Sequence, residues 1–224
     1  RDIAQWKDPT ALSEDERREY VASPSAPDHQ DVRVASQVVR QVPAGVLFMA
    51  DAAAEMRANL TSRIATRILR KVGYTRYRKE EHIYRAALDL PWPEWFDVHK
   101  TIAVKVGAQN APLKSLNFIT LKIKDAICDR FREETHERPS VDTEAPDVPV
   151  YAFFTPDAVT FYLDTSGEPL FKRGFKREAS AASIKENLAA GLLMLSGWAP
   201  GTPLLDPMCG AGTILLEAAD MALN

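Results

Sequence analysis

A short glycine-containing segment near the end of the sequence, Asp206–Thr213, has the residue types of a small-molecule site. The two leucines before it are typical of the end of a buried strand, and the Ala/Leu-rich residues 214–223 predict a helix. Gly210 and Gly212 remove side chains where the strand turns into the helix, so a ligand can approach the backbone closely. The first helical turn offers it unpaired N–H groups. These features predict a nucleotide-type site at the carboxyl end of a parallel strand.

The same segment lacks two common nucleotide motifs. Leu215 stands where a dinucleotide fingerprint has its third glycine, and no lysine follows Gly212 as a P-loop requires. The sequence Asp-Pro-Met-Cys-Gly-Ala-Gly-Thr resembles the first cofactor motif of S-adenosylmethionine-dependent methyltransferases, in the form found in RNA methylases that carry a THUMP domain. An ordinary glycine turn is the alternative. The cofactor-binding residues that the resemblance implies are Asp206, Pro207, Cys209, Gly210, Ala211, Gly212 and Thr213.

A long amphipathic helix is predicted over residues 51–72. Asp51 has a side chain suited to an N-cap. Apolar residues recur at every fourth position and would form the buried stripe of this helix. The members of the stripe are Leu60, Ile64, Ile68 and Val72. The residues on the opposite face would include Arg63, Arg67 and Arg70.

Basic residues gather in and after this predicted helix. Between Arg57 and Arg85 there are nine Lys and Arg side chains and two acidic ones, with three tyrosines interleaved. A solvated helix face explains one charge run of this kind. A phosphate-binding surface for RNA explains the charge and the tyrosines together, and the two interpretations stand about even.

The middle of the chain has the pattern of a small mixed sheet domain. Strands and helices alternate there, and the last two strands form a hairpin. The predicted elements are strands within residues 32–48, a helix over 77–90, a strand over 101–106, a helix over 114–134 and a hairpin of 148–154 with 158–163.

Motifs in this part of the chain widen the resemblance to about residues 46–224. Residues 122–127, 138–142 and 146–147 are similar to the THUMP region of bacterial large-subunit rRNA guanine methyltransferases. Similar motifs at residues 163–167, 172–175 and 184–190 lead to the cofactor segment. The resemblance implies an α+β part, ferredoxin-like plus THUMP, followed by the start of an α/β Rossmann-like methyltransferase domain. The predicted RNA-binding residues are Arg63, Arg67, Arg70, Lys122, Lys124, Lys172 and Arg173.

These patterns divide the chain into four segments. Residues 1–31, with eight acidic and four basic side chains, form an acidic arm without an assigned role. Residues 32–98 form a ferredoxin-like and helical subdomain, and residues 99–175 form the THUMP RNA-binding domain. Residues 176–224 form the truncated start of the Rossmann-like domain. Ser183–Glu186 has the residues of a capping box, which predicts that a helix starts there.

The composition excludes several classes of protein. A hydrophobic content of 46% and a charged content of 26% are ordinary for a soluble globular domain. No apolar run approaches the roughly 18 residues of a membrane helix. Cys128 and Cys209 are far apart and lack metal-ligand spacing, so we expect a reducing cytoplasm, no disulfide framework and no metal. The net charge of −3 gives no overall attraction to nucleic acid, so RNA binding must come from local asymmetry.

The resemblance predicts methyl transfer but assigns no catalytic residue. The family's Asn/Asp-Pro-Pro-aromatic motif, which holds the target amine, occurs nowhere in the 224 residues. The chain is therefore expected to be incomplete and inactive alone. The function that the resemblance implies is the RNA-binding and cofactor-loop portion of a 23S rRNA guanine-N2 methyltransferase that acts on large-subunit rRNA. The alternatives are a tRNA guanine-N2 or DNA adenine-N6 methyltransferase, and a non-catalytic THUMP-type RNA-binding module.

Overall fold

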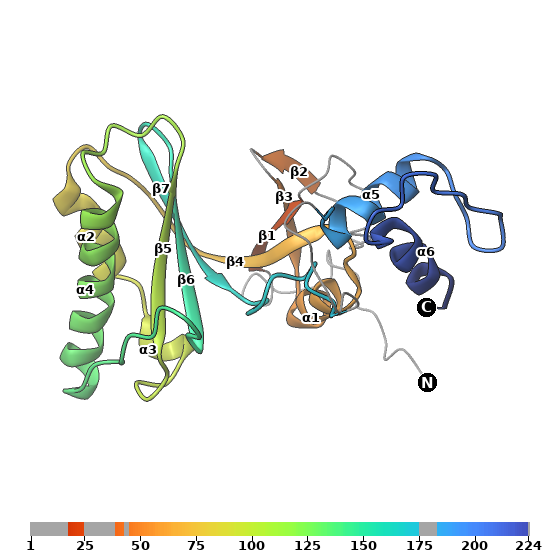
Figure 1. Ribbon diagram of the computed structural model, residues 1–224. Coiled ribbons are helices and arrows are strands. Elements are labelled where there is room, and N and C mark those ends of the chain that lie inside the picture. Colours follow the sequence, from red (N-terminus) through yellow and green to blue (C-terminus); the bar gives the residue numbers. More distant parts are fainter. Residues whose placement is uncertain (1–17, 25–38, 43–44, 175–182, 224) are drawn as a thin grey trace. The chain divides into compact units, whose positions relative to one another are not determined.

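The computed structural model describes residues 18–24, 39–42, 45–174 and 183–223. The chain forms two compact units (Figure 1). The first unit combines the residues up to Ile68 with those from Glu168 onward, and the second unit is Leu69–Gly167. Among the described helices, none is both long and apolar enough to cross a membrane.

The first unit begins with a small antiparallel sheet. Strand β3 (Gly45–Ala50) pairs with β1 (Arg18–Pro24) on one side and with β2 (Val39–Val42) on the other. The start of β4 (Ala65–Arg76) extends the strand order to β2-β3-β1-β4. Strand β1 falls within the predicted acidic arm, so part of that segment is a sheet strand that the sequence did not predict; residues 1–17 and 25–31 lie outside the described residues.

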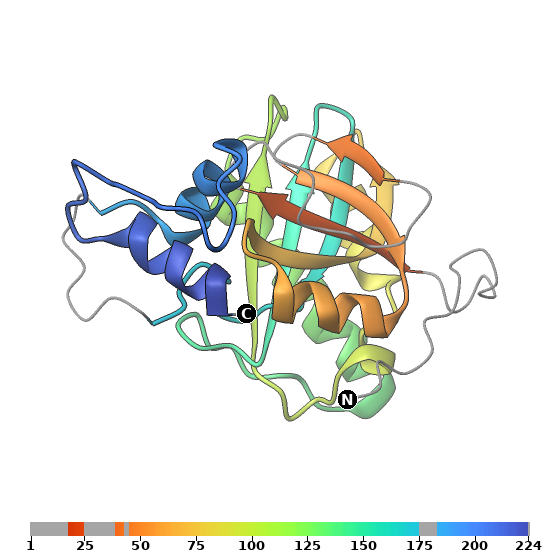
Figure 2. The ribbon, with the colours of Figure 1, turned by 90° about the vertical axis from the view of Figure 1, so that its right-hand side faces the viewer.

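Helix α1 (Ala52–Thr61) follows β3 and lies beside it (Figure 2). The predicted N-cap is confirmed, because Asp51 Oδ1 accepts a hydrogen bond of 2.7 Å from the N–H of Ala54. The predicted length is wrong, because the backbone turns extended at Ser62 and the chain enters β4. The Ser62 hydroxyl oxygen accepts from the N–H of Ala65 at 3.1 Å and stabilises this turn.

The four-residue apolar spacing misled the helix prediction for a geometric reason. Four is a multiple of the strand period of two, so the same spacing also fits one face of a strand. Ile64 and Ile68 are 2% and 0% exposed around the start of β4, whereas Leu60 on α1 is 85% exposed. The three arginines predicted on one helix face therefore occupy other places: Arg63 lies in the turn before β4, and Arg67 and Arg70 lie on β4.

The second unit is a four-stranded sheet with its helices on one face (Figure 1). The strand order is β4-β7-β6-β5, antiparallel except for the parallel pair of β6 and β5. The predicted strand, helices and hairpin are confirmed within a few residues. Their bounds are α2 Glu80–Leu88, α3 Trp92–Trp95, β5 Ile102–Ala108, α4 Leu116–Thr135, β6 Val148–Phe154 and β7 Ala158–Asp164.

Strict alternation along the strands places the core of the second unit. On β6, Val150, Ala152 and Phe154 are at most 1% exposed and join the core, whereas Tyr151 and Phe153 between them are half-buried. The core residues face helices α2, α3 and α4, which supply apolar side chains of their own. One face of this sheet is therefore covered by helices of the unit and the other is not.

Two helices complete the first unit, α5 (Glu186–Leu195) and α6 (Thr213–Leu223), which lie side by side (Figures 1 and 2). The predicted helix over residues 214–223 is confirmed by α6. The predicted capping box is wrong, because Lys185 is the N-cap of α5 and makes no side-chain capping bond. The predicted strand end at the two leucines 204–205 is also wrong: the segment has no strand structure, and Leu205 is 87% exposed.

Candidate cofactor loop and basic residues

The glycine segment forms a tight loop that leads directly into α6. Gly210 and Gly212 have φ angles of +52° and +71°, in the left-handed region that residues with a β-carbon rarely adopt. The N–H of Gly212 donates to the carbonyl of Cys209 at 2.7 Å, and the carbonyl of Gly212 accepts from Leu216 at 2.8 Å. The backbone conformation therefore explains both glycines without any neighbouring atom.

The space around the same loop is open. A β-carbon at Gly212 would meet nothing within 4 Å, and one at Gly210 would meet only the carbonyl oxygen of Met208, at 4.0 Å. The Asp206 carboxylate accepts from the N–H of Met208 at 3.1 Å and is thereby held at the start of the loop. An open loop with a fixed carboxylate at the N-terminus of a helix fits a small polar ligand such as S-adenosylmethionine.

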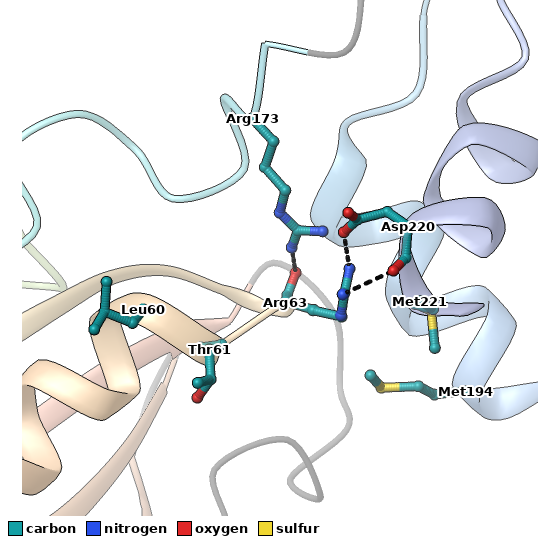
Figure 3. Close-up of a pocket in the computed structure, with 8 residues that line it drawn as sticks. Leu60, Thr61, Arg63, Arg173, Met194, Asp220 and Met221 are labelled. Atoms are coloured by element: carbon teal, nitrogen blue, oxygen red, sulfur yellow. Dashed lines mark hydrogen bonds and ion pairs between the residues drawn. The ribbon is translucent and has the colours of Figure 1, made fainter. Parts of the chain in front are cut away.

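A buried carboxylate holds α6 one turn after the loop. Glu217 is 1% exposed, and its Oε1 lies 3.2 Å from Nη1 of Arg63 and also pairs with Nη1 of Arg173. Arg63 additionally pairs with Asp220, one turn further along α6 (Figure 3). We call these four residues the ion-pair cluster.

The cluster is electrostatically self-consistent. Burial of the Arg63 guanidinium opposes its charge, but the hydrogen bonds and negative charges of Asp220 and Glu217 outweigh that effect and raise the pKa of Arg63. Arg173 also donates through Nη2 to the carbonyl oxygen of Arg63 at 2.6 Å. Two cations thus share two carboxylates, which is the condition under which buried charges are tolerated.

Two further contacts attach later segments to the start of β4. Asn187 on α5 is fully buried, and its side-chain amide donates to the carbonyl of Ile64 and to the hydroxyl of Thr66, both at 3.2 Å. The N–H of Leu170 donates to the carbonyl of Thr66 at 3.0 Å. Residues 63–66 are therefore bound by polar groups from more than 100 positions later in the sequence.

A hollow of about 560 Å³ lies beside the ion-pair cluster (Figure 3). Its walls include Leu60 and Thr61 of α1 on one side and Met194 and Met221 of α5 and α6 on the other. The charged groups at its edge, Arg63 and Asp220, are engaged with each other. The hollow therefore offers apolar walls but no uncompensated charge from this pair.

The seven predicted RNA-binding residues are not brought together at one place. Arg63, Arg67, Lys172 and Arg173 belong to the first unit, and Arg70, Lys122 and Lys124 belong to the second. Arg63 and Arg173 are held in the buried ion-pair cluster. The three lysines form exposed pairs instead, Lys122 with Glu81 at 3.8 Å, Lys124 with Asp125 at 2.5 Å and Lys172 with Glu168 at 2.8 Å. A phosphate can replace such surface partners at little cost, since exposed pairs contribute about 0–1 kcal/mol.

Sequence reasoning missed the ion-pair cluster and Asn187. A signal was present, because Glu217 and Asp220 interrupt an otherwise Ala/Leu-rich helix three residues apart, on one face. Their partners could not be found in this way, since Arg63 lies 154 positions earlier than Glu217. Within the described ranges, no three His, Cys, Asp or Glu side chains form a group that could hold a metal ion.

Comparison with known proteins places this geometry in a family. Residues 33–69 match the RlmL ferredoxin-like domain, residues 77–164 match the THUMP domain, and residues 173–224 match the RMKL-like methyltransferase domain. The chain belongs to the THUMP-domain methyltransferases. The predicted fold class is confirmed, with ferredoxin-like and THUMP parts followed by the start of a methyltransferase domain.

Individual members of this family resemble the chain over most of its length. It is 44% identical over 186 residues to the ribosomal RNA large subunit methyltransferase K/L of Colwellia psychrerythraea. That match covers 82% of this chain and 26% of the Colwellia protein, so this THUMP-domain chain spans about a quarter of its relative.

Two solved structures extend the likeness. One is described as a predicted N6-adenine-specific DNA methylase from Listeria monocytogenes, with 28% identity and a TM-score of 0.81 over 92% of this chain and 55% of that one. The other is described as a methyltransferase complexed with SAH, with 26% identity and a TM-score of 0.80 over 93% of this chain and 56% of that one. Both structures therefore share the arrangement of nearly all of this chain.

Proposed function

We propose that this chain is the RNA-binding and cofactor-loop portion of a 23S rRNA guanine-N2 methyltransferase that works in the cytoplasm. The observation that carries the proposal is the order of three matched domains together with 44% identity to a large-subunit rRNA methyltransferase. No catalytic base is assigned. The 224 residues alone are proposed to be inactive, because they contain no acceptor motif that would orient the target amine.

S-adenosylmethionine is the proposed cofactor. It would supply the activated methyl group, and the protein would supply orientation and exclusion of water. The open space at Gly210 and Gly212 and the fixed carboxylate of Asp206 support this assignment. The residues proposed to shape the pocket are Asp206, Pro207, Cys209, Gly210, Ala211, Gly212 and Thr213.

The RNA partner is proposed to bind through exposed basic residues. Lys122, Lys124 and Lys172 are the best placed, because their present carboxylate partners are at the surface. Arg67 and Arg70 on β4 stay in the proposed set. For Arg63 and Arg173 the buried ion pairs support a structural role, because leaving Glu217 unpaired would be costly. The division at residues 98/99 and 175/176 likewise stays a prediction.

Binding of the cofactor is tested with a substitution in the loop. Gly212→Val should abolish ultraviolet cross-linking of radiolabelled S-adenosylmethionine to the chain, because the side chain would occupy open space and strain a φ of +71°. Gly197→Val is a matched control, since Gly197 has the same φ and equally open surroundings outside the motif. Equal cross-linking to both variants would make the loop a purely structural turn.

The substrate class is tested by competition. A labelled 23S rRNA fragment bound to the chain should be displaced by unlabelled rRNA at lower concentrations than by tRNA or duplex DNA. Displacement by DNA at the lowest concentration would favour the second candidate, a DNA adenine-N6 methyltransferase, which the likeness to the Listeria protein supports. Binding of rRNA without any cross-linked cofactor would favour a non-catalytic RNA-binding module.

A further inference from the structure

The uncovered face of the second unit's sheet carries an ordered row of side chains. The strand register aligns Lys71 of β4 with Tyr162 of β7, Tyr162 with Tyr151 of β6, and Tyr151 with Lys105 of β5. Directly paired residues point to the same face of a sheet. The result is a row of lysine, tyrosine, tyrosine and lysine that crosses all four strands, which we call the lysine–tyrosine row.

A second row on the same face is also rich in aromatic residues. It aligns Tyr74, Thr160, Phe153 and Gly107 in the same strand order. Tyr74 is 58% exposed, and Phe153 is half-buried. The row between these two, Gly73, Phe161, Ala152 and Val106, turns to the other face and packs in the helix-covered core. Two rows with four aromatic rings therefore share the face that no helix of the unit covers.

Gly107 shapes this surface by lacking a side chain. A β-carbon built there would collide with the hydroxyl oxygen of Tyr151 and lie 3.4 Å from the ring of Phe153. The Tyr151 ring therefore reaches along the sheet from its own row to the backbone of β5 in the next row. A larger residue at this position would displace the ring from the surface.

The rings on this face are arranged differently from those in the core. Tyr151 and Tyr162 lie 6.3 Å apart with an interplanar angle of 35°, closer to parallel than to perpendicular. The core pairs Trp92–Trp95 and Tyr77–Phe154 pack edge to face at 86° and 77°. Rings that share an orientation on an accessible sheet offer their faces to flat ligands, and every nucleic-acid base has such a face.

The charges on the face match a nucleic acid. A lysine stands at each end of the lysine–tyrosine row, and Lys71 Nζ also lies 5.7 Å above the ring of Tyr74. No acidic residue belongs to either row. With strands about 4.8 Å apart, the two lysine backbones are roughly 14 Å from each other, which leaves both tyrosines between them.

We propose that this face binds single-stranded RNA, whose unpaired bases stack on Tyr151, Tyr162, Tyr74 and Phe153 while Lys71 and Lys105 neutralise the flanking phosphates. The inference rests on the proposed RNA-binding function and names the surface and the strand state that it requires. A duplex keeps its bases stacked on one another and cannot use the rings, so the face selects unpaired RNA.

The test uses the 224-residue chain and two fluorescent RNAs of equal length, one single-stranded and one duplex, with binding followed by anisotropy. Tyr151→Ala combined with Tyr162→Ala should weaken single-strand binding roughly tenfold or more, because each lost stacking partner accounts for about that factor. Duplex binding should stay unchanged. Tyr151→Phe with Tyr162→Phe keeps both rings and should retain the preference for single strands, and circular dichroism checks that each variant is folded.

Charge variants provide a second measurement. Lys71→Gln and Lys105→Gln should each lower the slope of log affinity against log salt by about 0.7 for the single strand. Lys122→Gln with Lys124→Gln on α4 is the matched control on the helix side, and it should leave the ratio of single-strand to duplex affinity unchanged. Unchanged single-strand binding by the tyrosine-to-alanine variant overturns the inference while RNA binding itself stands. Failure of the unsubstituted chain to bind either RNA overturns the proposed function, and the inference with it.

Discussion

The two units of this chain are held together by different kinds of contact. The second unit has a continuous apolar core in which large side chains such as Trp92, Phe131 and Phe161 are at most 1% exposed. The cluster in the first unit is smaller and consists largely of alanine, with Phe48 and Ile68 as its fully buried large members. The contacts described above between β4 and its later helices are polar: the ion-pair cluster and the side-chain amide of Asn187.

This difference decides what each unit tolerates. An apolar core accepts exchanges that conserve volume, because the hydrophobic effect is non-directional. A buried ion pair fails when either partner is removed, because the remaining charge is left without compensation. We therefore expect the second unit to be sensitive to lost volume and the first unit to be sensitive to lost charge.

The largest effect should come from a cavity in the second unit. Phe131→Ala should lower the free energy of unfolding by about 3–5 kcal/mol, because the ring is 1% exposed and packs 5.0 Å from that of Phe96. Denaturant unfolding followed by tryptophan fluorescence measures this. Phe118→Ala on the same helix is the control, since Phe118 is 46% exposed and its removal should cost far less. Equal losses would contradict the placement of the core.

A smaller effect is expected when charge is removed from the first unit. Glu217→Gln keeps the volume of the side chain but leaves Arg173 without its carboxylate, and should destabilise the first unit by about 2 kcal/mol. Hydrogen exchange should accelerate at residues 63–66 and in α6, with little change in the second unit. The control is Glu134→Gln, which removes an exposed pair with Arg130 and should cost about 0.5 kcal/mol or less. Uniform acceleration in both units would break the comparison.

A stabilising change is predicted at the end of α4. His136 is the C-cap and has a φ of +62°, which strains a residue with a β-carbon. His136→Gly should therefore raise the stability of the second unit by up to about 1 kcal/mol. Thermal unfolding measures the change. A loss of stability would show that the imidazole makes a contact that outweighs the strain.

The smallest predicted effect is a pH dependence in the second unit. Asp147 accepts hydrogen bonds from the N–H and hydroxyl of Thr101 at 2.9 and 3.1 Å, and these bonds lower its pKa. A lowered folded-state pKa adds stability above the ordinary aspartate pKa of about 3.9, and this stability is lost as the pH falls through the lower folded value. Asp147→Asn should remove this part of the acid sensitivity. An identical acid unfolding curve for both proteins would contradict the prediction.

The sequence predicted the second unit well because its signals are local. The alternation of Val150, Ala152 and Phe154 with half-buried neighbours is visible within seven residues. The predicted helix over 51–72 failed because its apolar spacing is compatible with two structures, and pairing with another strand decided between them. Leu205 failed for a related reason, since a strand exists only when it has a neighbour to pair with.

The candidate sites divide in the same way. The glycine loop was found because Gly210 and Gly212 reflect a local backbone requirement, confirmed by their positive φ angles. The ion-pair cluster was missed because its members lie up to 157 positions apart. Arg63 was assigned to RNA by its charge, while its actual partners, Glu217 and Asp220, are identifiable only in the folded chain.

The strand β4 has a consequence for how this family can vary. The two units meet along one unbroken strand at Ile68 and Leu69, where many multidomain proteins have a linker that tolerates insertions. A strand has a period of two, so inserting or deleting one residue at this point would exchange the two faces of everything that follows in it. Lys71 and Tyr74 would then turn toward the helices, and core-facing residues would turn outward. The join therefore acts as a ruler of fixed length, and over evolution it should change in sequence but not in the number of its residues.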